Sequence, residues 1–469
     1  MGKGKVGINL ILCLAVILRL VNLGQSFWLD EGAQALMSQK PFLFQWFGRG
    51  ADFQPPLFSL IIHFWMKMGT SEWFLRLPSV FFGVATIYLT YLLGNTIFNR
   101  KTGLLAAFFL AVAPYHIYYS QELRPYSLLA FLATASMFFL FKRNWSAYIL
   151  ATTALLYSSY MGLFLFLAQG IWVLAWQKTI IRSWLKSISL SFFLFLPWLP
   201  QFLKQFTAGQ NLTAILPEWG KLASLPVLKA LPLTFVKFSL GRVSFNDQLF
   251  YTMVSVFVLL IFGFVFYKAL RKLNKEKIFC LNWFLTPMVT VLLVSFFVPM
   301  FQPFRLLFVL IPFYLFLAIG VLNFSKRWQP VGVALVLIVS FYGLLSYYVN
   351  PEFQREDWRR AVQLIESQDS QKSVAIFEFS QPFAPYQWYA RGQIKAYGVL
   401  PGLKATPRLV EEQLPKAVQD AEEVYLFQYL QPLTDPDNLV SSWLGNHGFE
   451  QKEIKDFSGV GFVYNYIKE

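Results

Sequence analysis

Long apolar runs separated by short polar turns dominate the first three quarters of the chain. Runs of about 20 apolar residues match the length that a helix needs to cross a bilayer. The pattern therefore predicts about eleven membrane-spanning helices, at 6–24, 75–98, 103–118, 122–141, 145–159, 160–177, 184–203, 248–268, 280–299, 304–323 and 329–349. The apolar segment 56–68 is too short to span, and we expect it to lie in the membrane interface or to dip in and return.

The pattern changes at residue 350. Residues 351–469 contain no apolar run of membrane length, and helical and strand-like patterns alternate along them. Helices are expected near 356–367, 408–420 and 436–446, and strands near 373–379, 423–429, 449–457 and 460–467. The predicted fold class is therefore mainly α: a polytopic membrane helix bundle, residues 1–350, followed by a soluble extracytoplasmic α/β domain, residues 351–469.

Composition supports a membrane protein and excludes a nucleic-acid-binding one. The chain is 56% hydrophobic and only 14% charged, whereas soluble domains carry about 25% charged residues. The net charge of +15 is unevenly spread, because residues 1–350 hold 28 of the 40 basic residues but only eight of the 25 acidic ones. Cys13 and Cys280 both lie in apolar stretches and indicate neither a disulfide framework nor a metal site.

Basic residues mark every second turn between the predicted spans. They occur as Arg100-Lys101, Lys142-Arg143 and Lys326-Arg327 and in the turns 178–186 and 268–277. The positive-inside rule then predicts a multi-pass protein of the plasma membrane with a cytoplasmic N-terminus and an extracytoplasmic C-terminal domain. The first apolar run lacks a signal-peptidase site, so we expect it to remain as a helix.

Four acidic residues are predicted to lie together on the outer side of the membrane. Asp30, Glu31 and Asp52 fall in the first outer loop, 25–74, and Glu122 falls in the turn 119–124. Carboxylates close to hydrocarbon are costly, so such residues are candidates for function. The pattern predicts an extracytoplasmic active site centred on the first outer loop.

Five motifs resemble the GT-C class of membrane glycosyltransferases. They are residues 27–31 (FWLDE), 54–57 (QPPL), 69–79, 113–122 and 304–307 (FRLL). More narrowly, they are similar to the branch of protein O-mannosyltransferases and lipid A aminoarabinose transferases, glycosyltransferase families 39 and 83. The resemblance is dense over 20–140 and weaker to 350. It implies cell-envelope glycosylation, with a sugar transferred from a polyprenyl-phosphate donor to an acceptor outside the membrane.

Asp30 aligns with the first acid of the family's acidic pair, which implies a catalytic role. The acceptor hydroxyl must lose a proton as it attacks the sugar, and a carboxylate can take that proton as general base. The structural alternative is that Asp30 caps a helix beginning at Glu31. Glu31 either orients the acceptor or a metal ion, or interacts favourably with the positive end of that helix.

Asp52, Glu122 and His116 are candidates for acceptor or metal binding. Carboxylate oxygens suit a divalent cation, so a metal ion is a possible cofactor that the sequence does not decide. Their structural alternatives are a turn residue before Pro55 for Asp52, a partner of Arg124 or a helix-start charge for Glu122, and helix-end packing for His116, which we favour for that histidine.

Arg305 is the first candidate for the donor phosphate, because a guanidinium binds phosphate oxygens in bidentate fashion. Arg124 is the second, and an anchoring role in the interface is the alternative for both. Gln54 departs from relatives that often carry Lys or His before the two prolines, so its share in phosphate binding is in doubt. Glu72 and Arg76 match the family, but an ion pair at i, i+4 explains them.

Two other functions are compatible with a membrane bundle. A transporter or flippase for a lipid-linked sugar predicts internal repeats and ionisable residues at mid-membrane, and the sequence shows no convincing repeat. A non-catalytic scaffold leaves the acidic residues without a purpose. The glycosyltransferase hypothesis leads, while the sugar, the prenyl chain, the acceptor (a lipid, glycan or protein) and the oligomeric state are not determined by these motifs.

Overall fold

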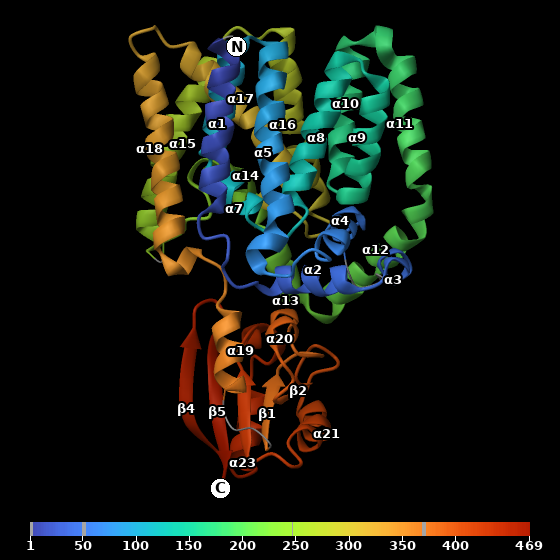
Figure 1. Ribbon diagram of the computed structural model, residues 1–469, viewed down its shortest axis with the longest axis vertical. Helices are drawn as coiled ribbons and strands as arrows, with labels where there is room; N and C mark the ends of the chain where they lie inside the picture. Colours follow the sequence, from blue (N-terminus) through green and yellow to red (C-terminus); the bar gives the residue numbers. More distant parts are fainter. Residues whose placement is uncertain (1–2, 49–52, 246, 368–371) are drawn as a thin grey trace. The chain divides into compact units, whose positions relative to one another are not determined.

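The computed structural model describes residues 3–48, 53–245, 247–367 and 372–469, and the chain divides into two compact units (Figure 1). The helical unit comprises Met1–Leu23, Phe42–Gln205 and Ala223–Phe353. The C-terminal unit comprises Gly24–Pro41, Phe206–Leu222 and Gln354–Glu469. This division differs from a single boundary at residue 350, because parts of two predicted outer loops group with the C-terminal residues.

Helices occupy all eleven predicted ranges, and three of these ranges hold more than one helical element. Residues 103–118 form α6 and α7, which are bent by 64°, and residues 184–203 form α11 and α12, joined by a 3-10 turn. The helices in these ranges are α1 Lys3–Leu20, α5 Glu72–Ile97, α6 Arg100–Ala111, α7 Pro114–Ser120, α8 Tyr126–Lys142, α9 Trp145–Ser158, α10 Gly162–Trp176, α11 Ile181–Phe195, α12 Leu199–Ile215, α15 Gln248–Leu270, α16 Lys275–Val294, α17 Leu310–Leu322 and α18 Gln329–Val349.

The other helical elements are short or lie outside the predicted spans. They include the 3-10 helix η3 Pro303–Val309, which leads into α17, and α4 Leu57–Trp65, which occupies the segment expected to be too short to span. The remaining ones of this group are α3 Phe42–Phe47, α13 Pro217–Ala223 and α14 Val227–Leu240.

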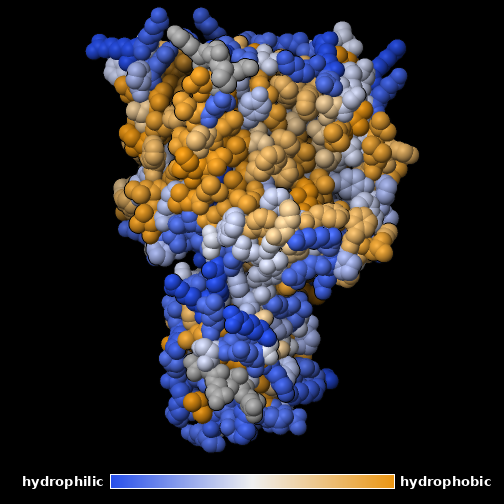
Figure 2. All heavy atoms as spheres, viewed as in Figure 1, coloured by the Kyte–Doolittle hydropathy of each residue, from blue (hydrophilic) through white to orange (hydrophobic). Residues whose placement is uncertain are grey.

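Among the described residues, six helices are long and apolar enough to cross a membrane, and the bent pair makes a seventh. Three shorter apolar helices, Val6–Leu20, Tyr126–Lys142 and Gly162–Trp176, accompany them. Figure 2 shows hydrophobic side chains as a broad band across the visible face of the helical unit. The N-terminus and the α5–α6, α15–α16 and α17–α18 connections lie at one end of this unit (Figure 1). The predicted polytopic helix bundle is confirmed.

Short polar residues begin several of these helices. Asn99 accepts a hydrogen bond from the amide of Thr102 at the start of α6, and Asn274 accepts one from Lys277 at the start of α16. Asp247 accepts from two amides at the start of α15. Each side chain satisfies an amide that has no acceptor within its helix, which explains why the apolar runs begin at these turns.

Glycine permits the closest approach between helices. A Cβ atom on Gly94 of α5 would lie 2.8 Å from the Cα of Gly103 on α6. A side chain at either position would force the two helices apart. Small residues at such crossings are how membrane helices gain close backbone packing, because lipid leaves them little hydrophobic drive to associate.

The C-terminal unit contains a five-stranded sheet in the order β2-β1-β3-β5-β4. Strand β1 pairs in parallel with β2 and β3, while β5 is antiparallel to both β3 and β4. The strands are β1 Ser373–Phe377, β2 Lys395–Gly398, β3 Glu423–Phe427, β4 Phe449–Phe457 and β5 Gly461–Lys468. The four predicted strands are confirmed, and the short β2 is an addition to them.

Helices cover both faces of this sheet. Successive side chains of its central strands point to opposite faces, and they are buried on both. Ile376 and Leu426 pack with residues of α21 Pro407–Ala417 and α23 Leu439–Asn446. Phe377 and Phe427 pack on the other face with residues of α19 Trp358–Glu366 and α20 Ala384–Tyr389. The short α22 Gln431–Thr434 follows β3 in the chain.

Helix α2, Leu29–Gln39, is part of the C-terminal unit although it ends 319 positions before α19 begins. Leu29 packs against the core beneath α19 and α20. A Cβ atom on Gly32 would lie 2.7 Å from the backbone nitrogen of Pro385 in α20. The glycine directly after the acidic pair therefore lets α2 lie close against α20.

Candidate active site

Within the C-terminal unit, four hydrogen bonds join the segment before the acidic pair to Arg355, Arg359 and Tyr389. The Arg359 guanidinium donates to the carbonyl of Gly24 at 2.8 Å, and the Arg359 amide donates to the Ser26 hydroxyl at 3.0 Å. The amide of Arg355 donates to the Gln25 side chain at 2.9 Å. The amide of Phe27 donates to the Tyr389 hydroxyl at 2.7 Å. The backbone leading to Asp30 is thus held at successive residues.

Asp30 and Glu31 both lie in the first turn of α2. Asp30 is partly buried and Glu31 is fully buried. The helix begins at Leu29 with Trp28 in the cap position, so the alternative in which Asp30 caps a helix starting at Glu31 is wrong. Their place in the first turn does favour negative charge, because the unpaired amides there are positive.

A third carboxylate, Glu356, lies beside this turn within the C-terminal unit. It accepts hydrogen bonds from the amide of Leu29 at 3.2 Å, from the Trp358 indole at 2.7 Å and from the Tyr429 hydroxyl at 2.9 Å. Burial raises the pKa of Glu356 to about 7, and the charge of Asp30 adds to the rise, while the three hydrogen bonds oppose it. Two acidic groups therefore act on each other at the start of α2.

In the helical unit, aromatic rings from α7, α8 and η3 form a continuous cluster. The ring of Phe304 lies 5.7 Å from that of Tyr119 and 5.1 Å from that of Tyr126. Tyr119 also contacts Tyr118, whose ring lies 5.1 Å from Tyr347 of α18. We call this set, Tyr118, Tyr119, Tyr126, Phe304 and Tyr347, the aromatic cluster.

Three arginines lie over rings of the aromatic cluster. The guanidinium of Arg242 lies 4.6 Å from the centre of the Tyr118 ring, and its NH group donates to the Tyr118 hydroxyl. Arg124 lies 5.8 Å from the Tyr126 ring, and Arg305 lies 5.7 Å from the Phe304 ring. Arg305 also donates to the carbonyls of Met300 and Ala223, which orients its guanidinium. Cation–π contacts of this kind are worth roughly 0.5–2 kcal/mol each.

Glu122 is fully buried in the turn between α7 and α8. The amide of Arg124 donates to its backbone carbonyl at 2.7 Å, so the turn is tight. Of the residues predicted from the sequence, the helical unit brings Arg124 and Arg305 to the aromatic cluster, and Glu122 lies two residues before Arg124 in the chain.

A buried arginine holds the bend between α6 and α7 in place. Arg19 of α1 donates to the carbonyl of Ala111 at 3.1 Å, at the end of α6, and contacts Nδ1 of His116 at 2.7 Å. Gln121 donates back to the carbonyls of Arg19 and Val21. The bond to Ala111 satisfies a carbonyl at the end of α6, and the bonds from Gln121 satisfy carbonyls at the end of the α1 segment. The contact with Arg19 accounts for the burial of His116 and supports the packing interpretation of this histidine.

Gln54 belongs to a hydrogen-bonded chain in the helical unit. Its backbone carbonyl accepts from the Gln205 side chain at 3.4 Å, and Gln205 in turn accepts from the Tyr160 hydroxyl. The Trp198 indole donates to the same Tyr160 hydroxyl at 2.9 Å. Asp52 lies outside the described residues. Arg76 is buried and donates to the carbonyl of Leu23 at 2.7 Å, which links α5 to the end of the α1 segment.

Within the described part of the chain, no group of three or more His, Cys, Asp or Glu side chains is arranged to hold a metal ion. Asp52, one of the candidate ligands, is not among the described residues.

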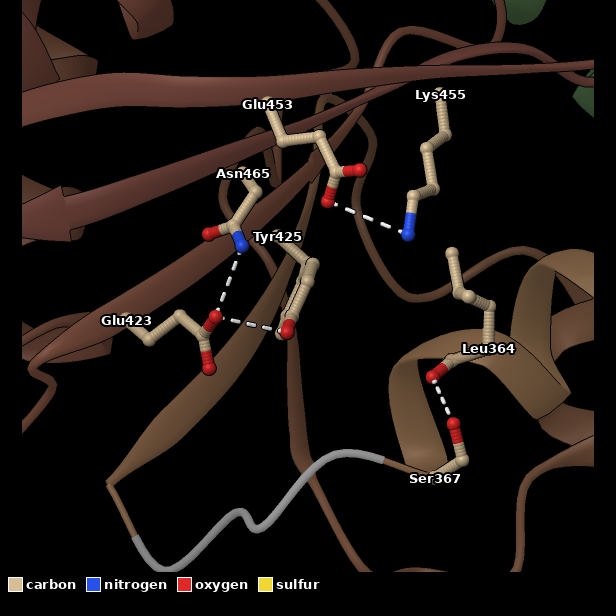
Figure 3. Close-up of polar contacts among 7 residues, drawn as sticks. All are labelled: Leu364, Ser367, Glu423, Tyr425, Glu453, Lys455 and Asn465. Atoms are coloured by element: carbon tan, nitrogen blue, oxygen red, sulfur yellow. Dashed lines mark hydrogen bonds and ion pairs between the residues drawn. The ribbon is translucent and has the colours of Figure 1, made fainter.

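A shallow pocket of about 60 Å³ lies on the sheet of the C-terminal unit (Figure 3). Tyr425, Glu453, Lys455 and Asn465 line it together with two apolar residues. Glu453 pairs with Lys455 at 3.2 Å, while Tyr425 and Asn465 both donate to Glu423. Its volume corresponds to about two water molecules, and its polar groups contact one another, so we assign it no function.

Sequence reasoning missed Arg19, Arg242 and Glu356. Arg19 was visible as a lone charge inside an apolar run, which marks a structural or functional residue in membrane helices. Arg242 follows the apolar run of α14 and was recognisable as a cation at its end. Glu356 carried no local signal, because its partners Leu29 and Tyr429 lie far away in the chain.

Comparisons with known proteins agree with this architecture. Residues 53–200 match the family of dolichyl-phosphate-mannose-protein mannosyltransferases. No curated protein sequence matches the chain. Among solved structures, apo ArnT from Cupriavidus metallidurans has 11% sequence identity and a TM-score of 0.60, over 99% of this chain and 98% of that one.

Two further structures carry ligands. ArnT from the same organism bound to undecaprenyl phosphate has 12% identity and a TM-score of 0.58, over 99% of this chain and 98% of that one. The Archaeoglobus fulgidus oligosaccharyltransferase in complex with Zn and sulfate has 12% identity and a TM-score of 0.55, over 98% of this chain and 73% of that one. The resemblance drawn from the motifs is confirmed: this multi-pass membrane protein has the ArnT-like fold of the GT-C glycosyltransferases.

Proposed function

We propose that this protein is an integral-membrane glycosyltransferase that moves a sugar from a polyprenyl-phosphate donor to an acceptor on the extracytoplasmic side. The observation that carries the proposal is the set of three arginines over the aromatic cluster. Guanidinium groups suit the phosphate of such a donor, and aromatic rings suit the faces of a sugar or the first isoprene units. The match of residues 53–200 to the mannosyltransferase family supports the same function.

In the proposed reaction, the acceptor oxygen attacks the anomeric carbon of the donor sugar. A new bond forms between that carbon and the acceptor oxygen, the bond from the carbon to the phosphate oxygen breaks, and the electron pair leaves with the polyprenyl phosphate. Asp30 takes the proton of the acceptor hydroxyl as general base. Glu31 is buried next to it and orients the acceptor.

The charge that develops on the departing phosphate needs cations that are already in place. Arg305, Arg124 and Arg242 take this role, with Arg305 the most restrained because two backbone carbonyls accept from its guanidinium. Gln54 lacks a charge, and its contribution is limited to a hydrogen bond. Glu122 lies two residues before Arg124 and is proposed to contact the sugar or the acceptor.

The test is a transfer assay with purified protein in nanodiscs. A panel of polyprenyl-phosphate sugars is supplied, and release of polyprenyl phosphate, by transfer or by slow hydrolysis, is measured. Turnover with at least one donor supports an enzyme. Movement of the intact donor between leaflets of a vesicle without release of polyprenyl phosphate contradicts the proposal and supports a flippase.

A further inference from the structure

The first turn of α2 lacks a local cap. The first amides of a helix have no acceptor within the helix and are usually satisfied by the side chain of the cap residue. The cap residue of α2 is Trp28, which makes no such bond. The amide of Leu29 is instead satisfied by Glu356, a residue 327 positions away. The Glu356 carboxylate thus takes the place of the cap side chain at the start of the helix that carries Asp30.

Glu356 is itself held on several sides. The Trp358 indole binds the same oxygen that accepts from Leu29, and the Tyr429 hydroxyl binds the other oxygen. Gly459, with a φ of +74°, lies against it from the turn between β4 and β5, and a Cβ atom there would lie 2.9 Å from the Glu356 side chain. Trp358, Tyr429 and Gly459 therefore restrain the Glu356 carboxylate in addition to its bond with α2.

The charged and titratable groups that face Glu356 are Asp30 from α2 and Tyr429 from the segment after β3. Burial and the charge of Asp30 raise the pKa of Glu356 to about 7. The group therefore changes its protonation close to neutral pH, and each change alters both the hydrogen bond to Leu29 and the electrostatic potential at Asp30.

We propose that Glu356 is a positioning residue for Asp30, which acts by fixing the first turn of α2. The inference rests on the proposed function, in which Asp30 receives the acceptor proton. It predicts that changes at Glu356 act on the chemical step and leave donor binding nearly unchanged.

The first measurement is independent of activity. Hydrogen–deuterium exchange of the full-length protein in nanodiscs reports on residues 27–33 in wild type, Glu356→Gln, Glu356→Asp and the control Glu352→Gln, an exposed glutamate nearby. We expect exchange in this segment to be at least fivefold faster in both Glu356 variants and unchanged in the control. Wild-type exchange in both Glu356 variants would overturn the inference.

The second measurement separates kcat from KM. We expect Glu356→Gln to lower kcat about 10- to 100-fold while KM for the donor stays within twofold, since misplacement of a catalytic group costs factors of this order. An inflection of kcat near pH 7 should be present in wild type and absent in Glu356→Gln. Tyr429→Phe, which leaves the bond to Leu29 in place, should lose less than fivefold.

Asp30→Asn, assayed in parallel, separates the two proposals. If Asp30→Asn is inactive while Glu356→Gln keeps the wild-type kcat and pH profile, the inference is wrong and the proposed function stands. If Asp30→Asn retains full transfer, the base is another residue, and both the proposed role of Asp30 and the inference are overturned.

Discussion

The two units contain candidate site residues of opposite charge, and different kinds of contact position these residues. In the helical unit, three arginines lie over aromatic rings, and two backbone carbonyls restrain Arg305. In the C-terminal unit, Asp30 and Glu31 lie in the first turn of α2, and Glu356 lies beside it and accepts hydrogen bonds from an amide, an indole and a phenol. The arginines are thus positioned by stacking, and Glu356 is positioned by three hydrogen-bond donors.

The difference follows from the chemistry of the two kinds of group. A guanidinium is planar and weakly hydrated, so an aromatic face can hold it while its edge donates hydrogen bonds, as Arg305 does to two carbonyls. A carboxylate is strongly hydrated and loses its charge on burial unless donors replace the water. The two kinds of charged group therefore require different surroundings.

The largest effect is expected at Asp30. Asp30→Asn removes the proton acceptor and should lower turnover about 10²- to 10⁴-fold, the usual range for a general base. The thermal unfolding temperature should change little, because the side chain is only partly buried. Asp437→Asn, on an exposed aspartate of the same unit, is the control. Full activity of Asp30→Asn would show that the Asp30 carboxylate is not the general base.

The arginines should act on the donor. Arg305→Ala and Arg242→Ala each remove one charged hydrogen-bond donor, which is worth about 1.5–3 kcal/mol, or roughly a 10- to 100-fold weaker donor interaction. Binding of polyprenyl phosphate and the donor KM are the measurements, and Arg327→Ala in an exposed turn is the control. Unchanged donor binding in both variants would place the phosphate elsewhere.

The packing of α2 should respond to a single methyl group. Gly32→Ala places a Cβ atom 2.7 Å from the backbone of Pro385, which cannot move aside easily. We expect a loss of about 1–3 kcal/mol of stability, typical of overpacking, together with a several-fold loss of turnover. Gly402→Ala is the matched control, since a Cβ atom there meets nothing within 4 Å. Equal unfolding temperatures for the two variants would contradict close packing of α2.

The smallest effect concerns a carboxyl of the C-terminal unit outside the candidate site. Burial and the neighbouring Asp435 raise the pKa of Glu378 from 4.5 to about 9. Between these two values the unfolded chain releases the proton and the folded protein keeps it, so stability falls as the pH rises. Glu378→Gln removes the titrating carboxyl and therefore this loss of stability at high pH.

Thermal unfolding of Glu378→Gln and wild type at pH 5 and pH 8 tests this expectation. The variant should unfold a few degrees higher than wild type at pH 8, and the difference should nearly vanish at pH 5. A difference that is the same at both pH values would show that the Glu378 proton does not control the stability of this unit.

Much of the fold could be predicted because the determining patterns are local. Apolar runs located helices in all eleven predicted ranges, and the alternation of helices and strands located four of the five strands. The 64° bend between α6 and α7 was not predicted, although Pro114 at the start of α7 is a local signal for a helix break; the bond from Arg19 to the carbonyl of Ala111 comes from another helix. Strand β2 was missed because it is only four residues long.

The sequence by itself determined the class of the protein: a membrane bundle with a following α/β domain, and acidic and basic residues of the kinds that glycosyl transfer requires. Hydropathy, charge bias and short motifs are properties of neighbouring residues, so they can be recognised without a structure. Only the tertiary structure decided that α2 belongs to the C-terminal unit, that Arg242 joins the aromatic cluster and that Glu356 supports the first turn of α2. Each of these depends on contacts between residues more than a hundred positions apart, and no local pattern records them.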